Sequence, residues 1–251
     1  MKQVRFEEHE VPYEVLGEFG LTREMIEDLP LFALEDIGRG RRSPVLPIRV
    51  KEEDGTTIKS RTRFALVRKD DGKVDVVFYP MLEASPLEDF NESQQKQLSD
   101  GKAILADMKM PDGRKGKMFV QIDNGTKQVM SVPTPVIGRN LQVLADEMHL
   151  GSAEVKSLQN GEPLTFIVDD EAITVGIDLN DPTGLRFSDG DSQKWKEQAK
   201  REWDKYTFGC YGCWVTDENG FPEYVPEEQY TEELWNEQKK SAERHASMLR
   251  K

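Results

Sequence analysis

The chain has 251 residues, 37% of them hydrophobic, and a formal net charge of −13, so its length suits one or two domains. It has no run of about 20 apolar residues, as a membrane span needs, and residues 1–10 lack the apolar core of a signal peptide. Its two cysteines cannot form a disulfide scaffold, and its acidity disfavours a protein that coats nucleic acid by bulk charge. We therefore expect no membrane partner.

Short helices are predicted for the first forty residues. Pro12 stands near the start of the first helix, where its missing N–H costs nothing. Thr22 is placed to cap a second helix over 23–29. A third helical piece over 32–37 ends at Gly38, because glycine favours the position after a helix end.

The pattern then changes to short runs that are rich in β-branched and aromatic residues. These runs cover residues 45–50, 57–67 and 74–79. They are separated by Asp54-Gly55 and Asp71-Gly72, and Asp-Gly pairs supply the positive φ angles of a tight hairpin. We predict a three-stranded antiparallel meander, which together with the helices forms an N-terminal domain over residues 1–85.

A local excess of positive charge lies in this region. Residues 39–69 hold ten Lys or Arg but three Asp or Glu, a local net charge of +7. Arginine forks suit phosphate or carboxylate contacts, so five arginines are candidates for an anion or nucleic-acid platform. They are Arg39, Arg41 and Arg42 on a glycine-flanked turn, and Arg61 and Arg63 on one face of the next strand. The alternative is that these charges are solvated groups at strand edges, which prevent aggregation between sheets.

Residues 86–190 are expected to form two small helix-plus-hairpin units. Asn91 and Gln94 form a capping-box pattern at the start of a short helix. A strand over 102–110 follows, and Asn124-Gly125 is the strongest hairpin signal in the sequence. A connecting helix over 140–149 precedes the second unit.

The two units resemble each other, which indicates an internal repeat. The recurring residues are Leu98 and Gly101 with Leu158 and Gly161, and Val-x-Ile-Asp at 120–123 and again at 175–178. Both copies have the predicted order helix, glycine stop, strand, turn, strand, turn and strand.

Residues 191–251 are predicted to form a C-terminal helical appendage with a Cys-x-x-Cys turn. Ser192 is placed to cap a helix that reaches about Tyr206, and Thr231 to cap the last helix. One face of the first of these helices carries three residues spaced four apart, Trp195, Ala199 and Trp203. We interpret this stripe as a packing face against the second repeat, in preference to a ligand or partner groove.

Cys210 and Cys213 form the one reactive motif that stands out. As half of a zinc site they need two further ligands, but the chain has no other cysteine, and His9, His149 and His245 lack ligand-pair spacing. A redox pair belongs at a helix N-terminus, whereas the aromatic flanks here indicate a strand or tight turn. We favour two small buried side chains and keep a thiol or metal function as an alternative.

No catalytic motif accompanies these features. The sequence lacks a G-x-S-x-G elbow, an H-E-x-x-H pair, a Walker A loop and a G-x-G-x-x-G fingerprint. We therefore predict no catalytic residues and no cofactor, and a protein that is more consistent with binding than with enzymatic activity.

Several stretches resemble two domains of unknown function that occur in proteins encoded on conjugative transposons of gut bacteria. The first resemblance rests on Val-Pro-Tyr-Glu-Val-Leu at 11–16, Gly-Leu-Thr at 20–22 and the stretch 34–43. The second rests on Gln94, Leu98 and Gly101 and on Gln-Ile-Asp at 121–123. The two domains commonly occur in one protein, often near genes for DNA-processing enzymes such as topoisomerases.

The resemblance covers residues 10 to about 190, and its motifs are structural ones. One departure is Ser43, which stands where the pattern has a threonine. The resemblance implies a bacterial cytoplasmic accessory protein of a mobile element and carries over no catalytic residue.

We predict an α+β protein, with N-terminal short helices on a three-stranded antiparallel meander, two helix-plus-hairpin repeat units and a C-terminal helical appendage. Its expected function is that of a non-enzymatic binding or adaptor protein of a mobile element that contacts a protein or nucleoprotein partner. The first alternative is DNA or RNA binding through residues 39–69. The second is the thiol or metal function of Cys210 and Cys213.

Overall fold

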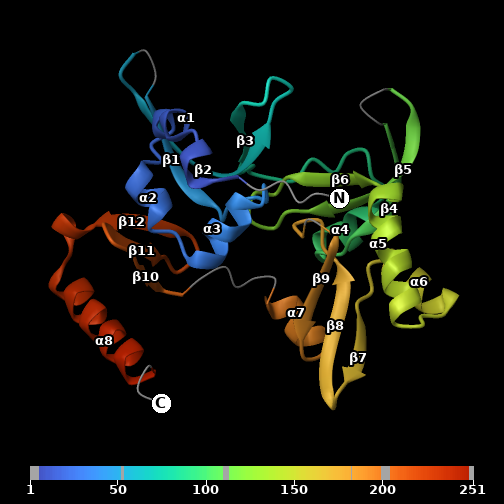
Figure 1. The fold of residues 1–251 in the computed structure, drawn as a ribbon. Helices are drawn as coiled ribbons and strands as arrows, with labels where there is room; N and C mark the ends of the chain where they lie inside the picture. Colours follow the sequence, from blue (N-terminus) through green and yellow to red (C-terminus); the bar gives the residue numbers. More distant parts are fainter. Residues whose placement is uncertain (1–5, 52–53, 110–112, 182, 199–203, 249–251) are drawn as a thin grey trace. The chain divides into compact units, whose positions relative to one another are not determined.

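The structure is a computed structural model that describes residues 6–51, 54–109, 113–181, 183–198 and 204–248. Within these residues the strands form four antiparallel sheets of three strands each, and the strands of each sheet are consecutive in the chain (Figure 1). Helices accompany the sheets, which confirms the predicted α+β class. The chain divides into two compact units, Met1–Pro80 with Trp203–Lys251, and Met81–Glu202. No helix of the described residues is both long and apolar enough to cross a membrane.

The N-terminal part of the first unit has short helices followed by a meander. Its helical elements are η1 (Glu8–Glu10), α1 (Tyr13–Glu18), α2 (Arg23–Glu27) and α3 (Leu31–Gly38). Its strands are β1 (Leu46–Lys51), β2 (Thr57–Arg68) and β3 (Val74–Pro80), with β2 in the centre. Thr22 caps α2 as predicted, because its hydroxyl accepts a hydrogen bond from the Met25 N–H at 3.4 Å.

The C-terminal part of the same unit adds a sheet that the sequence did not predict. Its elements are β10 (Tyr206–Phe208), β11 (Gly212–Thr216), β12 (Pro222–Pro226), η2 (Glu227–Gln229) and α8 (Glu232–Met248). The helix predicted from Ser192 does not reach Tyr206, since that residue is the first of β10. The predicted cap of α8 is present, since the Leu234 N–H donates to the Thr231 hydroxyl at 3.3 Å.

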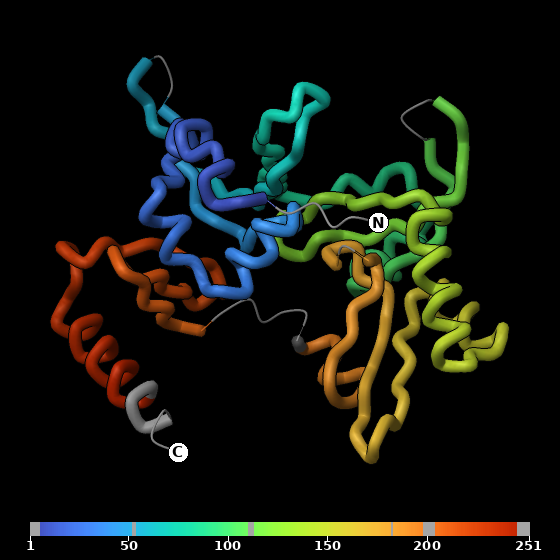
Figure 2. The backbone as a smooth tube through the Cα atoms, viewed as in Figure 1, coloured from blue at the N-terminus to red at the C-terminus, as the bar shows by residue number. Residues whose placement is uncertain are grey.

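One hydrophobic core joins the two parts of this unit. Leu16 and Ile26 from the helices pack with Phe64 of β2 and with Trp214 of β11, which is fully buried. The indole N–H of Trp214 donates to the Met25 carbonyl at 3.1 Å. Figure 2 shows the segment from β10 to β12 running beside the N-terminal helices. Residues far apart in the sequence therefore form a single core.

The second unit contains the same arrangement of elements twice. The first copy consists of α4 (Glu92–Ser99), β4 (Ile104–Lys109), β5 (Lys115–Ile122) and β6 (Val129–Pro133). The second consists of α6 (Ser152–Gln159), β7 (Leu164–Val168), β8 (Glu171–Ile177) and β9 (Leu185–Asp189). Between them lies α5 (Thr134–Glu147), which begins before the predicted residue 140, and α7 (Ser192–Gln198) follows the second copy. The early start of α5 agrees with Pro135, which is tolerated in a first helical turn.

Equivalent residues of the two copies have equivalent local roles. Leu98 and Leu158 are both fully buried, and Gly101 and Gly161 have φ angles of +80° and +79° after their helices. The two copies also meet at Gly161, where a Cβ atom would lie 2.2 Å from the Ala103 carbonyl oxygen. Glycine is therefore needed at position 161 both for its φ angle and for this close approach.

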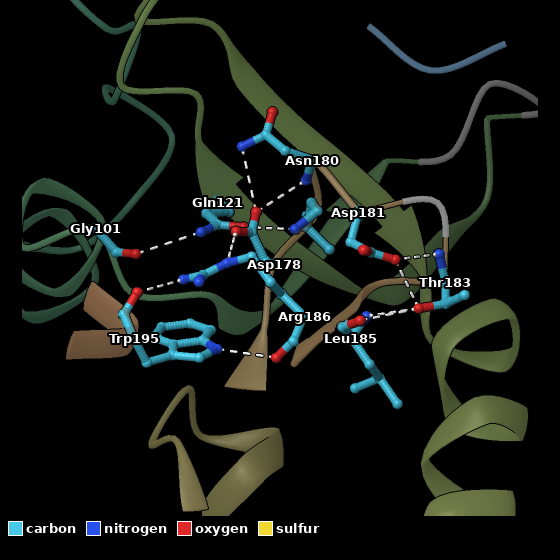
Figure 3. Close-up of polar contacts among 10 residues, drawn as sticks. Gly101, Gln121, Asp178, Asn180, Asp181, Thr183, Leu185, Arg186 and Trp195 are labelled. Carbon is cyan, nitrogen blue, oxygen red and sulfur yellow. Dashed lines mark hydrogen bonds and ion pairs between the residues drawn. The ribbon is translucent and has the colours of Figure 1, made fainter. Parts of the chain in front are cut away.

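A buried polar cluster connects the two copies and α7 (Figure 3). The Asp178 carboxylate accepts from Arg186 Nε at 2.7 Å, and the Arg186 guanidinium lies 3.8 Å from the centre of the Trp195 ring. Trp195 also covers Gly176 of β8, so it packs on the second repeat as its spacing indicated. Gln121 of the first copy accepts the Leu179 N–H at 2.7 Å. Ala199 and Trp203, the other residues of the predicted stripe, lie outside the described residues.

Candidate functional site

The five arginines of the predicted anion platform are engaged within their own unit. Arg39 lies 3.6 Å from the Glu35 carboxylate, one helical turn before it. Arg41 donates to the Asp36 carboxylate at 3.0 Å. The first two members of the glycine-flanked turn therefore fold back onto the acidic residues of α3.

The next two members contact the meander. The Arg42 guanidinium lies 4.0 Å from the centre of the Tyr79 ring, a cation–π contact. Arg63 donates to the Ser43 carbonyl at 2.9 Å. Both side chains are half-buried, so they stabilise the packing of the turn against β2 and β3.

Arg61 has the most extensive contacts of the five. It donates to the Pro222 carbonyl at 3.1 Å and to the Glu223 carboxylate at 2.7 Å, and it lies 4.6 Å from the centre of the Phe221 ring. Arg61 thus binds the start of β12 from β2, and it does not lie with the other four as one free cationic surface.

The Cys-x-x-Cys motif forms the turn between β10 and β11. Cys210 is exposed, whereas Cys213 is fully buried in β11. Burial raises the pKa of the Cys213 thiol to about 11, so this residue stays protonated at neutral pH. Among the described residues, no group of three or more His, Cys, Asp or Glu side chains is arranged to hold a metal ion.

The same turn is held in place by a buried carboxylate. Asp28, directly after α2, is 3% exposed and accepts the Cys210 N–H at 2.6 Å and the Tyr211 N–H at 3.0 Å. The Tyr224 hydroxyl donates to it at 2.6 Å. A Cβ atom at Gly209 would lie 2.1 Å from the Asp28 carboxyl carbon, so glycine lets the turn approach this closely. Burial, followed by the hydrogen bond to Asp28, raises the pKa of Tyr224 well above its usual value.

The position of the turn creates a surface groove. A cavity of about 740 Å³ is lined by three aromatic residues and three carboxylates, which we call the acidic aromatic groove. Its members are Tyr211, Tyr224 and Trp235, with Glu24, Glu227 and Glu228. Tyr211 is 50% exposed and Trp235 is 39% exposed, so aromatic surface remains in contact with solvent.

A chain of hydrogen bonds assembles this groove. Glu24 lies four residues before Asp28, near the start of the helix that Asp28 follows. The Tyr211 N–H is bound to Asp28, and the Tyr211 carbonyl accepts the Glu227 N–H at 3.0 Å. Asp28 therefore brings η2 and its carboxylates close to Glu24.

A second cavity adjoins the first because both are lined by Glu24 and Tyr211. It has a volume of about 640 Å³, and we call it the apolar pocket after its aliphatic side chains, Val11, Ile26, Leu34 and Ile37. Its rim is charged, because Glu8, Glu24 and Glu27 line it as well. Arg23 also lines this cavity, but it is bound to Glu8 and Glu27.

Sequence reasoning singled out two residues that line this cavity, Thr22 as a helix cap and Cys210 as part of the Cys-x-x-Cys motif, each for a reason unrelated to a groove. The groove joins the start of α2 to residues about two hundred positions later, and no local pattern indicates that contact. The glycines at 209 and 212, which permit the close turn, were the available signal.

The comparisons with known proteins match part of the chain. Residues 6–89 match the model of a protein family of unknown function, DUF4099. This match supports the prediction of an unknown-function domain in the N-terminal region. No curated protein and no solved structure matches the chain.

We predict that Asp28→Ala lowers the free energy of unfolding by about 2–3 kcal/mol, because two backbone N–H groups and a hydroxyl lose their charged acceptor. Tyr224→Phe removes a single donor and should cost about 1 kcal/mol. Urea denaturation followed by Trp fluorescence measures both values. A stability of Asp28→Ala equal to that of the wild type would contradict the anchoring role.

We also predict that a thiol reagent modifies one cysteine of the native chain at pH 8. Cys210 should react fast, and Cys213 should react after urea is added, because its thiolate forms near pH 11. Cys210→Ser should leave no fast-reacting thiol. Since the folded chain keeps a proton that the unfolded chain loses, stability should fall as the pH rises from 9 towards 11. Equal native reactivity of both thiols would instead support the thiol hypothesis.

Proposed function

We propose that this protein is a non-enzymatic binding or adaptor protein that contacts a protein partner through the acidic aromatic groove. The observation that carries the proposal is the groove itself, in which exposed aromatic rings lie beside carboxylates. Aromatic residues are enriched where proteins bind each other, and clefts between elements are common binding sites. From the resemblance to domains encoded on conjugative transposons, we further propose that it acts in the bacterial cytoplasm as an accessory protein of a mobile element.

The proposal predicts that the partner is lost when the groove carboxylates are neutralised. Tagged wild-type chain and a groove variant, Glu24→Gln/Glu227→Gln/Glu228→Gln, are used to capture partners from a lysate of the source bacterium. The captured protein is identified and purified, and its affinity is measured by calorimetry. We expect binding to be at least about tenfold weaker for the groove variant, because charged contacts at an interface contribute to orientation and affinity.

A matched control separates the groove from bulk charge. Glu14→Gln/Glu18→Gln/Glu218→Gln removes three exposed carboxylates of the same unit that do not line the cavity, and it should bind as the wild type does. Equal binding by all three proteins would overturn the assignment of the groove. Hydrolysis or modification of nucleic acids or nucleotides by the purified chain, in a metal-supplemented screen, would overturn the non-enzymatic proposal.

Nucleic-acid binding through residues 39–69 is the second candidate function. Arg49 of β1 lies directly opposite Lys59 of β2, and both are exposed. Like charges opposite each other in a sheet repel, and a bound polyanion relieves that repulsion. These two residues, and not the engaged arginines, carry this candidate.

The second candidate predicts weak, salt-dependent binding of a labelled DNA or RNA 20-mer in fluorescence anisotropy. Arg49→Ala/Lys59→Ala should weaken this binding more than Arg39→Ala/Arg41→Ala/Arg42→Ala does, because the latter three have partners in their own unit. No binding at 20 mM salt, or binding unchanged in both variants, would contradict it. The thiol or metal function of Cys210 and Cys213 remains a third prediction, which the thiol titration addresses.

A further inference from the structure

The described lining of the acidic aromatic groove contains three carboxylates and no Lys or Arg. Among the described residues, no Lys or Arg forms an ion pair with Glu24, Glu227 or Glu228. Some other acids on the same unit are paired, as Glu8 and Glu27 are by Arg23. A backbone N–H, the Thr22 hydroxyl and, more weakly, the charge of the neighbouring Arg23 lower the pKa of Glu24, so it is ionised at neutral pH. The groove therefore has a local negative potential that favours a cation.

The aromatic members of the groove favour the same kind of ligand. A cation close to the face of a Trp or Tyr ring is attracted by the ring quadrupole. Trp235 packs edge-on against Tyr230, with ring centres 5.1 Å apart, and this contact fixes one side of the indole. Tyr211 is held at its backbone by Asp28 and Glu227. The indole of Trp235 and the backbone of Tyr211 are thus preorganised, which reduces the entropy lost on binding.

The adjoining apolar pocket indicates a second feature of the ligand, an apolar side chain. Glu24 and Tyr211 line both cavities, so a chain that crosses them meets the carboxylates of the groove on one side. On the other side it meets aliphatic side chains such as Val11, Leu34 and Ile37, beside Arg23 with its paired Glu8 and Glu27. A linear peptide presents different side chains to neighbouring subsites in this way. An acidic peptide or a nucleic-acid phosphate would be repelled by the three carboxylates.

We propose that the occupant of the acidic aromatic groove is a linear segment of a partner protein that carries a Lys or Arg next to an apolar residue. The cation binds among Glu24, Glu227, Glu228 and the exposed rings, and the apolar side chain enters the apolar pocket. This inference rests on the proposed function and adds the chemistry of the partner.

The test uses the full chain on an array of heptapeptides whose central residue is Arg, Lys, Glu or Ser, with Leu or Ser beside it. We expect at least about tenfold more binding for Arg or Lys centres than for Glu or Ser centres, and a further gain with Leu. The variant Glu24→Gln/Glu227→Gln/Glu228→Gln should lose this preference. The control Glu14→Gln/Glu18→Gln/Glu218→Gln should keep it.

Two further variants probe the subsites separately. Trp235→Ala should weaken binding of basic peptides, and Leu34→Ser should remove the gain from Leu without changing the preference for a cation. Circular dichroism of each variant establishes that it is folded.

Three outcomes would overturn the inference. The first is that the wild-type chain shows no preference for peptides with a basic centre, and the second is that the groove and control variants lose peptide binding equally. The third is a concentration-dependent dimer of the chain that the groove variant abolishes, because this would identify a second copy as the occupant. If the groove variant loses its identified partner while the wild type binds no basic peptide, the proposed function stands and the basic segment is wrong. If basic peptides bind the groove but the identified partner does not depend on it, the proposed function fails instead.

Discussion

The buried carboxylate of Asp28 determines how the first unit is built. A charge removed from water is costly unless it is hydrogen-bonded, and each donor identified for Asp28 belongs to a distant segment: the N–H groups of Cys210 and Tyr211 and the hydroxyl of Tyr224. The C-terminal sheet therefore has to be in place for the carboxylate to be buried with its hydrogen bonds made. Once the sheet is docked, Trp214 completes the hydrophobic core, so the two parts of the unit depend on each other for folding.

This dependence also links stability to the candidate site. The residues that match the family model end at position 89, whereas the core that they form includes Trp214. The acidic aromatic groove exists because the turn at 210–211 is bound beside α2, which brings Glu24 and the carboxylates of η2 to one cavity. A change at the end of α2 that loosens the turn would therefore disassemble the groove as well as weaken the core.

Local sequence signals predicted much of the fold. The features that they did not predict depend on contacts between residues far apart in the sequence. The cap at Thr22, the meander and the repeated Leu and Gly of the second unit follow from patterns within a few residues. The C-terminal sheet was missed because β10 has three residues and β11 has five, too few for a period-two pattern to stand out. Asp28 was missed because an acidic residue at a helix end is usually solvated, and its partners cannot be identified from the sequence.

The charged residues show most clearly that long-range contacts cannot be read from the sequence. The excess of +7 over residues 39–69 suggested a cationic surface, but Arg61 is bound by Glu223, which lies 162 positions later. Conversely, Glu24 begins a helix with nothing unusual in its neighbourhood, yet the fold joins it to Glu227 and Glu228 without a cation of the described residues among them. The fold thus neutralises several of the charges that are concentrated in the sequence, such as Arg39, Arg41 and Arg61, and it brings together carboxylates that are dispersed in the sequence. The electrostatic potential of a surface is set by the charges that the fold leaves without an ion-pair partner, and in this groove those charges are negative.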